Sequence, residues 1–308
     1  MTDHQKTITE RIAESSTVPG ACRVDRPPFP KKAKIEVTSR CDLKCFFCQH
    51  TYDTRGLGDV DPALFRRLLR ELREAGVDEL GLFWIGEPLL NRALPDYVAE
   101  AKALGYPYVF LTTNGRLATP DRLRALFDAG LDSIKFSFNA DDRESYRQIC
   151  GVDGFDRTLE NLRTAWEYRR DRATPRIYAS TVQIPGREAA YEATKQLIEP
   201  YVDQHYPLRL YGPYTVGADA RVATSPSEES RPLDSMLPCW SLFTEPHISY
   251  DGHMSACFCD HDQRLYMGDL KIMSLMEAWH SEEFVALRRR HLAGDVRGTV
   301  CQGCIAYR

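Results

Sequence analysis

Short apolar runs alternate with amphipathic segments along residues 33–211 of the chain. Apolar residues three or four positions apart indicate helices, and compact apolar runs bounded by turn residues indicate strands. Strands are predicted at residues 34–38, 79–84, 108–112, 133–138, 176–183 and 208–211. Helices are predicted between them at residues 61–76, 94–104, 120–129, 155–170 and 188–201. This order predicts an α/β fold in which a parallel sheet curls into a full or partial TIM-like (β/α)6 barrel.

The predicted helix at residues 61–76 carries the clearest boundary signals. Asp61 stands at the N-cap position, Pro62 opens the helix and Gly76 ends it. Residues 1–32 end in a proline-rich stretch and are predicted to form an extended or partly helical leader. Residues 212–238 are rich in Gly, Pro, Ser and Glu and are predicted to be a linker, with residues 239–308 as a second, smaller domain.

Charge and cysteine usage narrow the possible functions. A net charge of −4 gives no electrostatic case for binding nucleic acid or a membrane surface. No apolar run approaches a membrane span and the polar N-terminus is not a signal peptide, so a cytoplasmic protein is predicted. Thiols stay reduced in that compartment, so ten cysteines point to metal binding or catalysis before disulfides. Eight of them cluster at residues 41–48 and 239–304.

The first cluster places Cys41, Cys45 and Cys48 directly after the first predicted strand. Ligands of parallel α/β folds gather at the carboxyl ends of the strands, so the three thiols are expected at that rim. Three soft sulfur donors can hold one metal centre and leave a coordination position open. Neither His50 nor Cys150 is well placed as a fourth ligand. A zinc knuckle and three reduced core thiols are the competing interpretations.

Polar or glycine-containing motifs end the next strands at the same rim. The second strand runs into Gly86-Glu87-Pro88, where glycine permits a close backbone approach and the carboxylate can accept from an ammonium group. The third ends in Thr113-Asn114-Gly115, the fourth in Ser137-Phe-Asn139 and the fifth at Gln183. Each motif alone has a structural explanation as a turn or a strand end. Their order, one after each strand, indicates a shared binding site.

Taken together, these features resemble radical S-adenosylmethionine (SAM) enzymes over residues 33–211. The C-x3-C-x2-C spacing is similar to the family signature, in which three cysteines hold a [4Fe–4S] cluster whose open iron is chelated by SAM. The resemblance implies that Cys41, Cys45 and Cys48 are the cluster ligands. It also implies that Glu87, in a motif similar to the family's G-G-E-P, binds the SAM amino group. Ile85 replaces the first glycine of that motif and puts the local backbone geometry in question.

The same resemblance assigns the remaining SAM contacts. Phe47 matches the aromatic position that abuts adenine, and Ser137 with its neighbour Asn139 matches the contacts to ribose and carboxylate. Gln183 matches a position that contacts adenine and ribose, and the Thr113-Asn114-Gly115 ending recurs in the family. The family's activity implies a one-electron donor such as flavodoxin or ferredoxin.

The C-terminal cysteines form a second group. Asp251-Gly252 predicts a β-hairpin turn shortly before Cys257, and an amphipathic helix is predicted near residues 275–292. Four thiols can enclose a cluster completely, and a four-cysteine zinc site is the structural alternative. The layout resembles the truncated SPASM domain called Twitch, with spacing similar to that of radical SAM aminocyclitol dehydrogenases. That resemblance implies one auxiliary [4Fe–4S] cluster held by Cys239, Cys257, Cys301 and Cys304.

One thiol of this region is left over. Cys259 lies two residues beyond Cys257, and extended backbone would turn both side chains to one face. It is an inert core thiol, an alternate cluster ligand, or a catalytic residue that returns a hydrogen atom to a substrate radical. The first two interpretations rank ahead of the third, which would change the reaction.

The resemblance implies an enzyme that cleaves SAM to a 5′-deoxyadenosyl radical and takes a hydrogen atom from an unactivated carbon. Electron transfer to the auxiliary cluster would give dehydrogenation, and hydrogen return by a thiol would give epimerisation. The leading hypothesis is oxidoreductase or epimerase action on a small polar metabolite, such as an aminocyclitol or amino sugar of antibiotic-type biosynthesis. Modification of a ribosomally made peptide is the alternative. A zinc-binding scaffold without activity is the non-enzymatic hypothesis.

Overall fold

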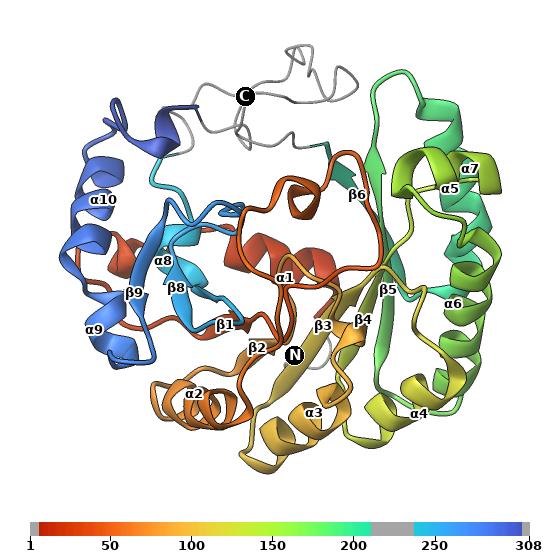
Figure 1. Cartoon of the computed structure of the whole chain (residues 1–308), viewed down its shortest axis with the longest axis horizontal. Coiled ribbons are helices and arrows are strands. Elements are labelled where there is room, and N and C mark those ends of the chain that lie inside the picture. Colours follow the sequence, from red (N-terminus) through yellow and green to blue (C-terminus); the bar gives the residue numbers. More distant parts are fainter. Residues whose placement is uncertain (1–5, 211–236, 304–308) are drawn as a thin grey trace.

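The computed structural model describes residues 6–210 and 237–303 of the chain. Within these ranges a single nine-stranded sheet runs in the order β6-β5-β4-β3-β2-β1-β7-β8-β9. Strands β1 to β6 pair in parallel with their neighbours, and β7 pairs in parallel with β1. The sheet is curved and open, with β6 and β9 as its edges (Figure 1). The predicted parallel α/β partial barrel is confirmed.

The barrel strands differ from the prediction mainly at the last one. Their bounds are β1 (Lys32–Ile35), β2 (Glu79–Gly81), β3 (Tyr108–Thr113), β4 (Ser133–Ser137), β5 (Arg176–Gln183) and β6 (Gln204–Arg209). The prediction for β6 is wrong in its start, because the strand begins four residues before position 208. Pro207 lies inside it, which an edge strand tolerates although proline has no N–H group. The predicted last residue of that strand, Tyr211, and nearly all of the predicted linker lie outside the described residues.

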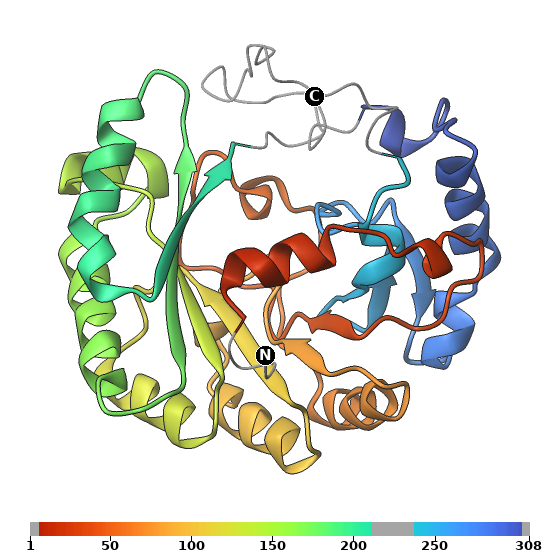
Figure 2. The same cartoon turned by 180° about the vertical axis from the view of Figure 1, so that it is seen from behind.

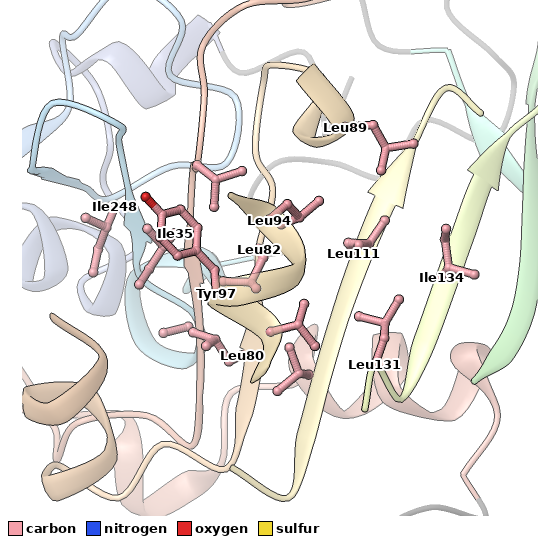
Figure 3. Close-up of a cluster of buried hydrophobic side chains, with 14 of the residues drawn as sticks. Ile35, Leu80, Leu82, Leu89, Leu94, Tyr97, Leu111, Leu131, Ile134 and Ile248 are labelled. Carbon is pink, nitrogen blue, oxygen red and sulfur yellow. The ribbon is translucent and has the colours of Figure 1, made fainter. Parts of the chain in front are cut away.

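Helices cover the outer face of the sheet (Figure 1). The predicted ones are α2 (Pro62–Glu74), α3 (Leu94–Ala103), α4 (Pro120–Asp128), α6 (Phe155–Arg169) and α7 (Glu188–Ile198). Asp61 caps α2 as predicted, since its carboxylate accepts from the backbone N–H groups of Ala63 and Leu64. The apolar core lies between these helices and the sheet. In Figure 3, Leu94 and Tyr97 of α3 lie in one cluster with Ile35, Leu80 and Leu111 of the sheet side.

Two helix predictions need correction. The helix α5 (Arg143–Cys150) was not predicted, although Asp142 caps it through the Ser145 N–H group and Gly151 ends it with a positive φ of 75°. The single helix predicted at residues 275–292 is two helices, α9 (Leu275–Trp279) and α10 (Glu282–Leu292). Ser281 accepts from the N–H group of Phe284 at 3.3 Å and so starts a new helix inside a continuous amphipathic pattern.

The C-terminal region continues the barrel sheet. It contains the short helix α8 (Ser241–Thr244) and the strands β7 (His247–Ile248), β8 (His253–Ser255) and β9 (Tyr266–Asp269). The predicted hairpin is present between β7 and β8, with Gly252 at a φ of 89° in its turn. Because β7 pairs with β1, the strand that precedes the first cysteine cluster also supports the segment that carries the second one.

The leader contains the helix α1 (Ile8–Ser15), in line with the partly helical interpretation. Figure 2 shows α1 across the open side of the curved sheet, between β6 and α8. Gln204 of β6 donates to the Thr9 hydroxyl at 2.5 Å, and Thr244 of α8 donates to the carbonyl of Ser15 at 2.6 Å. In the part of the chain that the structure describes, none of the helices has the length and apolar character needed to cross a membrane.

Candidate active site

A cavity of about 310 Å³ opens at the carboxyl ends of the barrel strands. It is lined by residues that follow or end each of the six parallel strands, which the order of the sheet brings to one rim. Most of the sequence-predicted site residues of the barrel share this cavity. They are Cys41, Cys45, Phe47, Cys48, Gly86, Glu87, Thr113, Asn114, Ser137 and Asn139.

Gln183 is the exception among the predicted cofactor contacts. It ends β5 with an exposed side chain and does not line the cavity, whereas the preceding residue, Val182, does. Successive residues of a strand point to opposite faces, so a one-residue difference in position decides which side chain faces the ligand. The structure does not bring Gln183 to the other site residues.

The loop with the three cysteines is held in place by α5. The backbone N–H group of Lys44 donates to the carbonyl of Cys150 at 2.9 Å, and that of Phe46 donates to Ile149 at 3.1 Å. The loop then turns back on itself, with Cys48 donating to the carbonyl of Cys45 at 2.9 Å. The last turn of α5, the helix missing from the prediction, is therefore what presents the thiols to the cavity.

The three thiols are desolvated in this loop. Burial raises the pKa of Cys41 and raises the pKa of Cys48 to about 12. The pKa of Cys45 is also raised, first by a hydrogen bond with Cys150 and then by burial. The raised pKa values favour the protonated thiols. To lose their protons and act as ligands, these cysteines require positive charge close by, and a bound metal centre supplies it.

The arrangement of donors also bears on which metal group fits. Cys41, Cys45 and Cys48 supply three soft sulfur donors to the wall of the open cavity. Three thiolates can hold a cluster and leave one iron free for a further ligand. The donor set therefore fits a cluster with a free iron.

Glu87 connects two segments of the rim. Its Oε1 accepts from the Thr113 hydroxyl at 2.6 Å and the Leu89 N–H group at 3.0 Å, and its Oε2 accepts from the Asn114 N–H group at 2.7 Å. Burial raises the pKa of Glu87 to about 7, against these hydrogen bonds, which lower it. A carboxylate oxygen has two lone pairs, so Oε2 keeps acceptor capacity for one further donor.

Asn114 extends this network to the cysteine loop. Its side-chain amide donates to Asp42 at 2.8 Å, and Arg116 donates to the other oxygen of Asp42 at 2.7 Å. Asp42 directly follows Cys41 in the sequence. Thr113 and Asn114 therefore position Glu87 and the cysteine loop relative to each other.

Sequence reasoning missed a buried pair beneath the Gly86-Glu87 turn. Glu36 is fully buried and bound by Arg55 through two hydrogen bonds of 2.8 and 3.0 Å. The carboxylate of Glu36 also accepts from the N–H groups of Ile85 and Gly86, at 3.2 and 3.3 Å. Arg55 in turn binds Asp53, just beyond the cysteine loop. The signal available in the sequence was the charged residue Glu36, which stands between Ile35 and Val37 in a segment where Ala33, Ile35 and Val37 are buried.

The backbone geometry of this turn depends on the glycine at position 86 and is compatible with Ile85. A Cβ atom at position 86 would lie 2.1 Å from the carbonyl oxygen of Thr38 and 2.9 Å from that of Arg40. Its turn thus packs directly on the backbone that leads from β1 to Cys41, and Arg40 accepts the N–H group of Glu87 at 2.8 Å. The glycine is needed for this close approach at position 86, while a side chain fits at position 85.

The second cysteine group adjoins the same rim. The indole N–H group of Trp84, which lines the cavity, donates to the carbonyl of Phe258 at 2.8 Å. Phe258 also stacks on Trp240, with ring centroids 5.5 Å apart, so Cys239 and Cys257 belong to neighbouring segments. Cys301 lies half-buried in a 3-10 turn, Val300–Gly303, and Cys304 lies outside the described residues.

Cys259 is almost fully buried, at 1% exposure, and does not line the cavity. Its backbone N–H group donates to the sulfur of Cys257 at 3.3 Å. This position favours the inert-thiol or alternate-ligand interpretation over direct contact with a substrate.

Comparisons with known proteins match both halves of the chain. The family model "Radical SAM superfamily" matches residues 35–195, and "Iron-sulfur cluster-binding domain" (SPASM) matches residues 239–305. Among curated proteins, the probable GTP 3′,8-cyclase of Metallosphaera sedula is 35% identical over 144 residues, 46% of this chain and 45% of the relative. The Saccharolobus solfataricus protein of the same description is 38% identical over 136 residues, 43% of this chain and 42% of the relative. The match therefore spans less than half the length of these relatives.

Solved structures share the fold at low sequence identity. SuiB of Streptococcus suis, bound to its precursor peptide SuiA, has a TM-score of 0.69 at 16% identity, covering 91% of this chain and 70% of SuiB. BtrN in complex with AdoMet and 2-DOIA has a TM-score of 0.54 at 19% identity, covering 86% of this chain and 88% of BtrN. The radical SAM family model alone spans more than half of the 308 residues. The protein is thus an enzyme of the radical SAM superfamily that carries a C-terminal SPASM iron–sulfur cluster-binding domain.

Proposed function

We propose that this enzyme is a radical SAM oxidoreductase or epimerase that removes a hydrogen atom from a carbon of a small polar metabolite, such as an aminocyclitol or amino sugar. The observation that carries the proposal is the shared cavity. The three cysteines of the C-x3-C-x2-C motif, Glu87, and the ends of β3 and β4 face one space of about 310 Å³. Hydrogen abstraction requires the cofactor and the substrate carbon to be held close together, and one shared cavity places the groups that would bind them side by side.

The cofactors follow from the family. They are SAM, a [4Fe–4S] cluster that binds it, and a second, auxiliary [4Fe–4S] cluster in the SPASM domain. When bound and reduced, the first cluster supplies the electron that splits SAM into methionine and a hydrogen-abstracting 5′-deoxyadenosyl radical. Cys41, Cys45 and Cys48 would hold that cluster. In the SPASM domain, Cys239, Cys257, Cys301 and Cys304 would hold the auxiliary cluster. This domain contacts the rim through Trp84, whose indole N–H group donates to the carbonyl of Phe258.

The rim residues would bind SAM in distinct ways. Glu87 would accept from an N–H of the SAM amino group at Oε2, and Phe47 would pack on adenine. Asn139 already accepts the Val182 N–H group at 2.9 Å through Oδ1, so its amide N–H groups are the ones left to bind ribose or carboxylate, together with Ser137. Gln183 would reach adenine only if the end of β5 or the loop after it changed conformation so that its side chain faced the cavity.

The substrate class rests on the compact site and on the relatives. The structural neighbours include both BtrN, solved with 2-DOIA, and SuiB, solved with a peptide, so a ribosomally made peptide remains the second candidate. The buried position of Cys259 favours dehydrogenation, with the auxiliary cluster as electron acceptor, over hydrogen return by that thiol.

The test is isotope transfer. Reduced enzyme is incubated with SAM and either uniformly deuterated aminocyclitols and amino sugars or deuterated precursor peptides encoded beside the gene. Deuterium in 5′-deoxyadenosine from the small molecules supports the proposal. Deuterium from a peptide alone would overturn the small-molecule assignment and leave the radical chemistry in place.

The binding of SAM is expected to depend on pH through Glu87. Because the pKa of Glu87 is raised from 4.5 to about 7, the SAM-free protein loses stability from this group as pH rises through 7. The ionised carboxylate is the form that accepts from the N–H groups of the SAM amino group, so SAM affinity is expected to fall about tenfold between pH 8 and pH 6. Equilibrium dialysis with labelled SAM under anaerobic conditions measures this.

Glu87→Gln provides the control, since the variant experiences the same titration of SAM itself. It is expected to bind SAM more weakly and to lose the part of the pH dependence that belongs to the carboxylate. Identical pH profiles for the two proteins would show that Glu87 does not contact the SAM amino group.

A further inference from the structure

The inner face of the barrel carries an unusual set of lysines. On β1, Ala33 and Ile35 pack toward the helices, and the alternating residues Lys32 and Lys34 lie on the opposite face. Burial lowers the pKa of Lys34, Glu245 partly offsets this, and the charges of Lys32 and Lys135 add to the lowering. The three ammonium groups are therefore close enough to repel one another inside the barrel.

Two of these three lysines have a counter-charge. Glu245, just before β7, is buried at 2% exposure and lies 2.5 Å from the ammonium group of Lys34 and 3.2 Å from that of Lys32. Lys32 also lies 3.9 Å from Glu79. The buried Arg11 also pairs with Glu79, so three cations share two carboxylates in this part of the barrel interior, and each cation has a carboxylate partner.

Lys135 has no such partner. Its ammonium group donates to the hydroxyl of Tyr206 at 3.0 Å, and it lies 5.4 Å from the centre of the same ring. In the two described stretches of the chain, no carboxylate comes within 4.0 Å of it. A half-buried charge held against one aromatic ring without an opposite charge is costly, and such a group is a candidate for binding an anionic ligand.

Lys135 also lies in the wall of the proposed catalytic cavity. Apart from the cysteines, Glu87 is the other ionisable group among the lining residues that the structure describes, and it already accepts three hydrogen bonds. Lys135 precedes Ser137 by two residues on the same face of β4, which places it about 6.6 Å further from the rim. It therefore sits deeper than the residues expected to hold ribose and carboxylate of SAM.

We propose that Lys135 binds an anionic group of the substrate, a carboxylate or a phosphate, in the floor of the cavity. The proposal rests on the proposed function and narrows its substrate class. A free aminocyclitol carries only positive charge and would meet an uncompensated lysine. An amino sugar bearing a phosphate, a nucleoside diphosphate or a carboxylate complements it, and Phe83 and Trp84 offer apolar surface for the ring beside the anion.

The test uses anaerobic enzyme with both clusters and bound SAM. The probes are glucosamine, glucosamine 6-phosphate and inorganic phosphate, titrated calorimetrically at constant ionic strength. Glucosamine 6-phosphate is expected to bind at least about tenfold more tightly than glucosamine, as a charge-assisted contact provides. Lys135→Met should remove that difference, Lys135→Arg should keep most of it, and Lys31→Met, at an exposed lysine beside β1, should not change it.

Two results would overturn the proposal. One is equal affinity of the wild-type enzyme for glucosamine and its 6-phosphate. The other is a Lys135→Met variant that loses SAM affinity while probe binding is unchanged, which would assign the lysine to the SAM carboxylate. Formation of 5′-deoxyadenosine by the dithionite-reduced wild-type enzyme is measured in parallel. Its absence with intact probe binding would reject the proposed radical function and leave the anion site standing.

Discussion

Replacing Cys48 with alanine is expected to lower the formation of 5′-deoxyadenosine from SAM by more than about 100-fold, since losing even an outer partner of a metal ligand costs 10–100-fold. The side chain of Cys48 lines the cavity and is one of only three sulfur donors in the loop. A cluster held by two thiols is not retained. Iron and acid-labile sulfide should therefore fall by about four atoms each per chain, while the SPASM cluster stays.

Cys22→Ala is the matched control for this experiment. Cys22 is a half-buried free thiol in the 3-10 turn Gly20–Cys22 and lies outside both cysteine groups. This variant is expected to keep its iron, its sulfide and its rate of SAM cleavage. A Cys48→Ala protein with full iron content and wild-type cleavage would contradict the assignment of the triad.

Replacing Arg55 with methionine is expected to destabilise the protein by about 3–5 kcal/mol, because it leaves the carboxylate of Glu36 buried without its partner. Both side chains are fully removed from solvent. The loss should also loosen the Ile85-Gly86 turn, whose N–H groups Glu36 accepts, and so weaken SAM binding. Urea unfolding, monitored by circular dichroism, and anaerobic SAM binding measure the two effects.

Arg66→Met removes an arginine from an exposed pair with Glu100 and serves as the control, with an expected loss of about 0–1 kcal/mol. Adding Glu36→Gln to Arg55→Met should recover part of the stability, because the unpaired charge is gone. If Arg55→Met lowered the free energy of unfolding by no more than Arg66→Met, the Arg55–Glu36 pair would not be what stabilises this part of the rim.

Local signals in the sequence account for the parts of the fold that were predicted. Alternation of apolar runs with helical spacing gave the order of the barrel elements, and Asp61 with Pro62 gave the start of α2. The errors also have local causes. The first residues of β6, Gln204 and His205, are polar and form no apolar run, and the continuous apolar pattern around Ser281 concealed a helix boundary.

The candidate site was predictable where it depends on strand ends. Cys41, Glu87, Asn114 and Ser137 each follow or end a strand, and parallel strands bring such positions to one rim. Residues that act through long-range contacts could not be found in this way. Glu36 reaches the Tyr250 N–H group at 3.3 Å across 214 positions of sequence, and no spacing in the chain encodes that meeting.

The charge of the substrate pocket was also beyond the sequence. Lys135 is one lysine among many until the fold shows that Glu245 pairs with its neighbours Lys32 and Lys34, while no carboxylate of the described residues pairs with Lys135. Pairing between a strand of the barrel and a residue more than 200 positions later decides this balance. The cavity and its electrostatics therefore had to be taken from the structure.

The central claim is that Cys41, Cys45 and Cys48 hold a cluster whose open iron binds and cleaves SAM beside Glu87. Its most direct test is anaerobic reconstitution with iron and sulfide, reduction with dithionite, addition of SAM, and chromatography for 5′-deoxyadenosine and methionine. The account predicts equal amounts of both products from the wild-type enzyme and none above background from Cys48→Ala. A reconstituted wild-type protein that carries its clusters, binds SAM and never forms 5′-deoxyadenosine, even with the anionic amino sugar probes present, would contradict it.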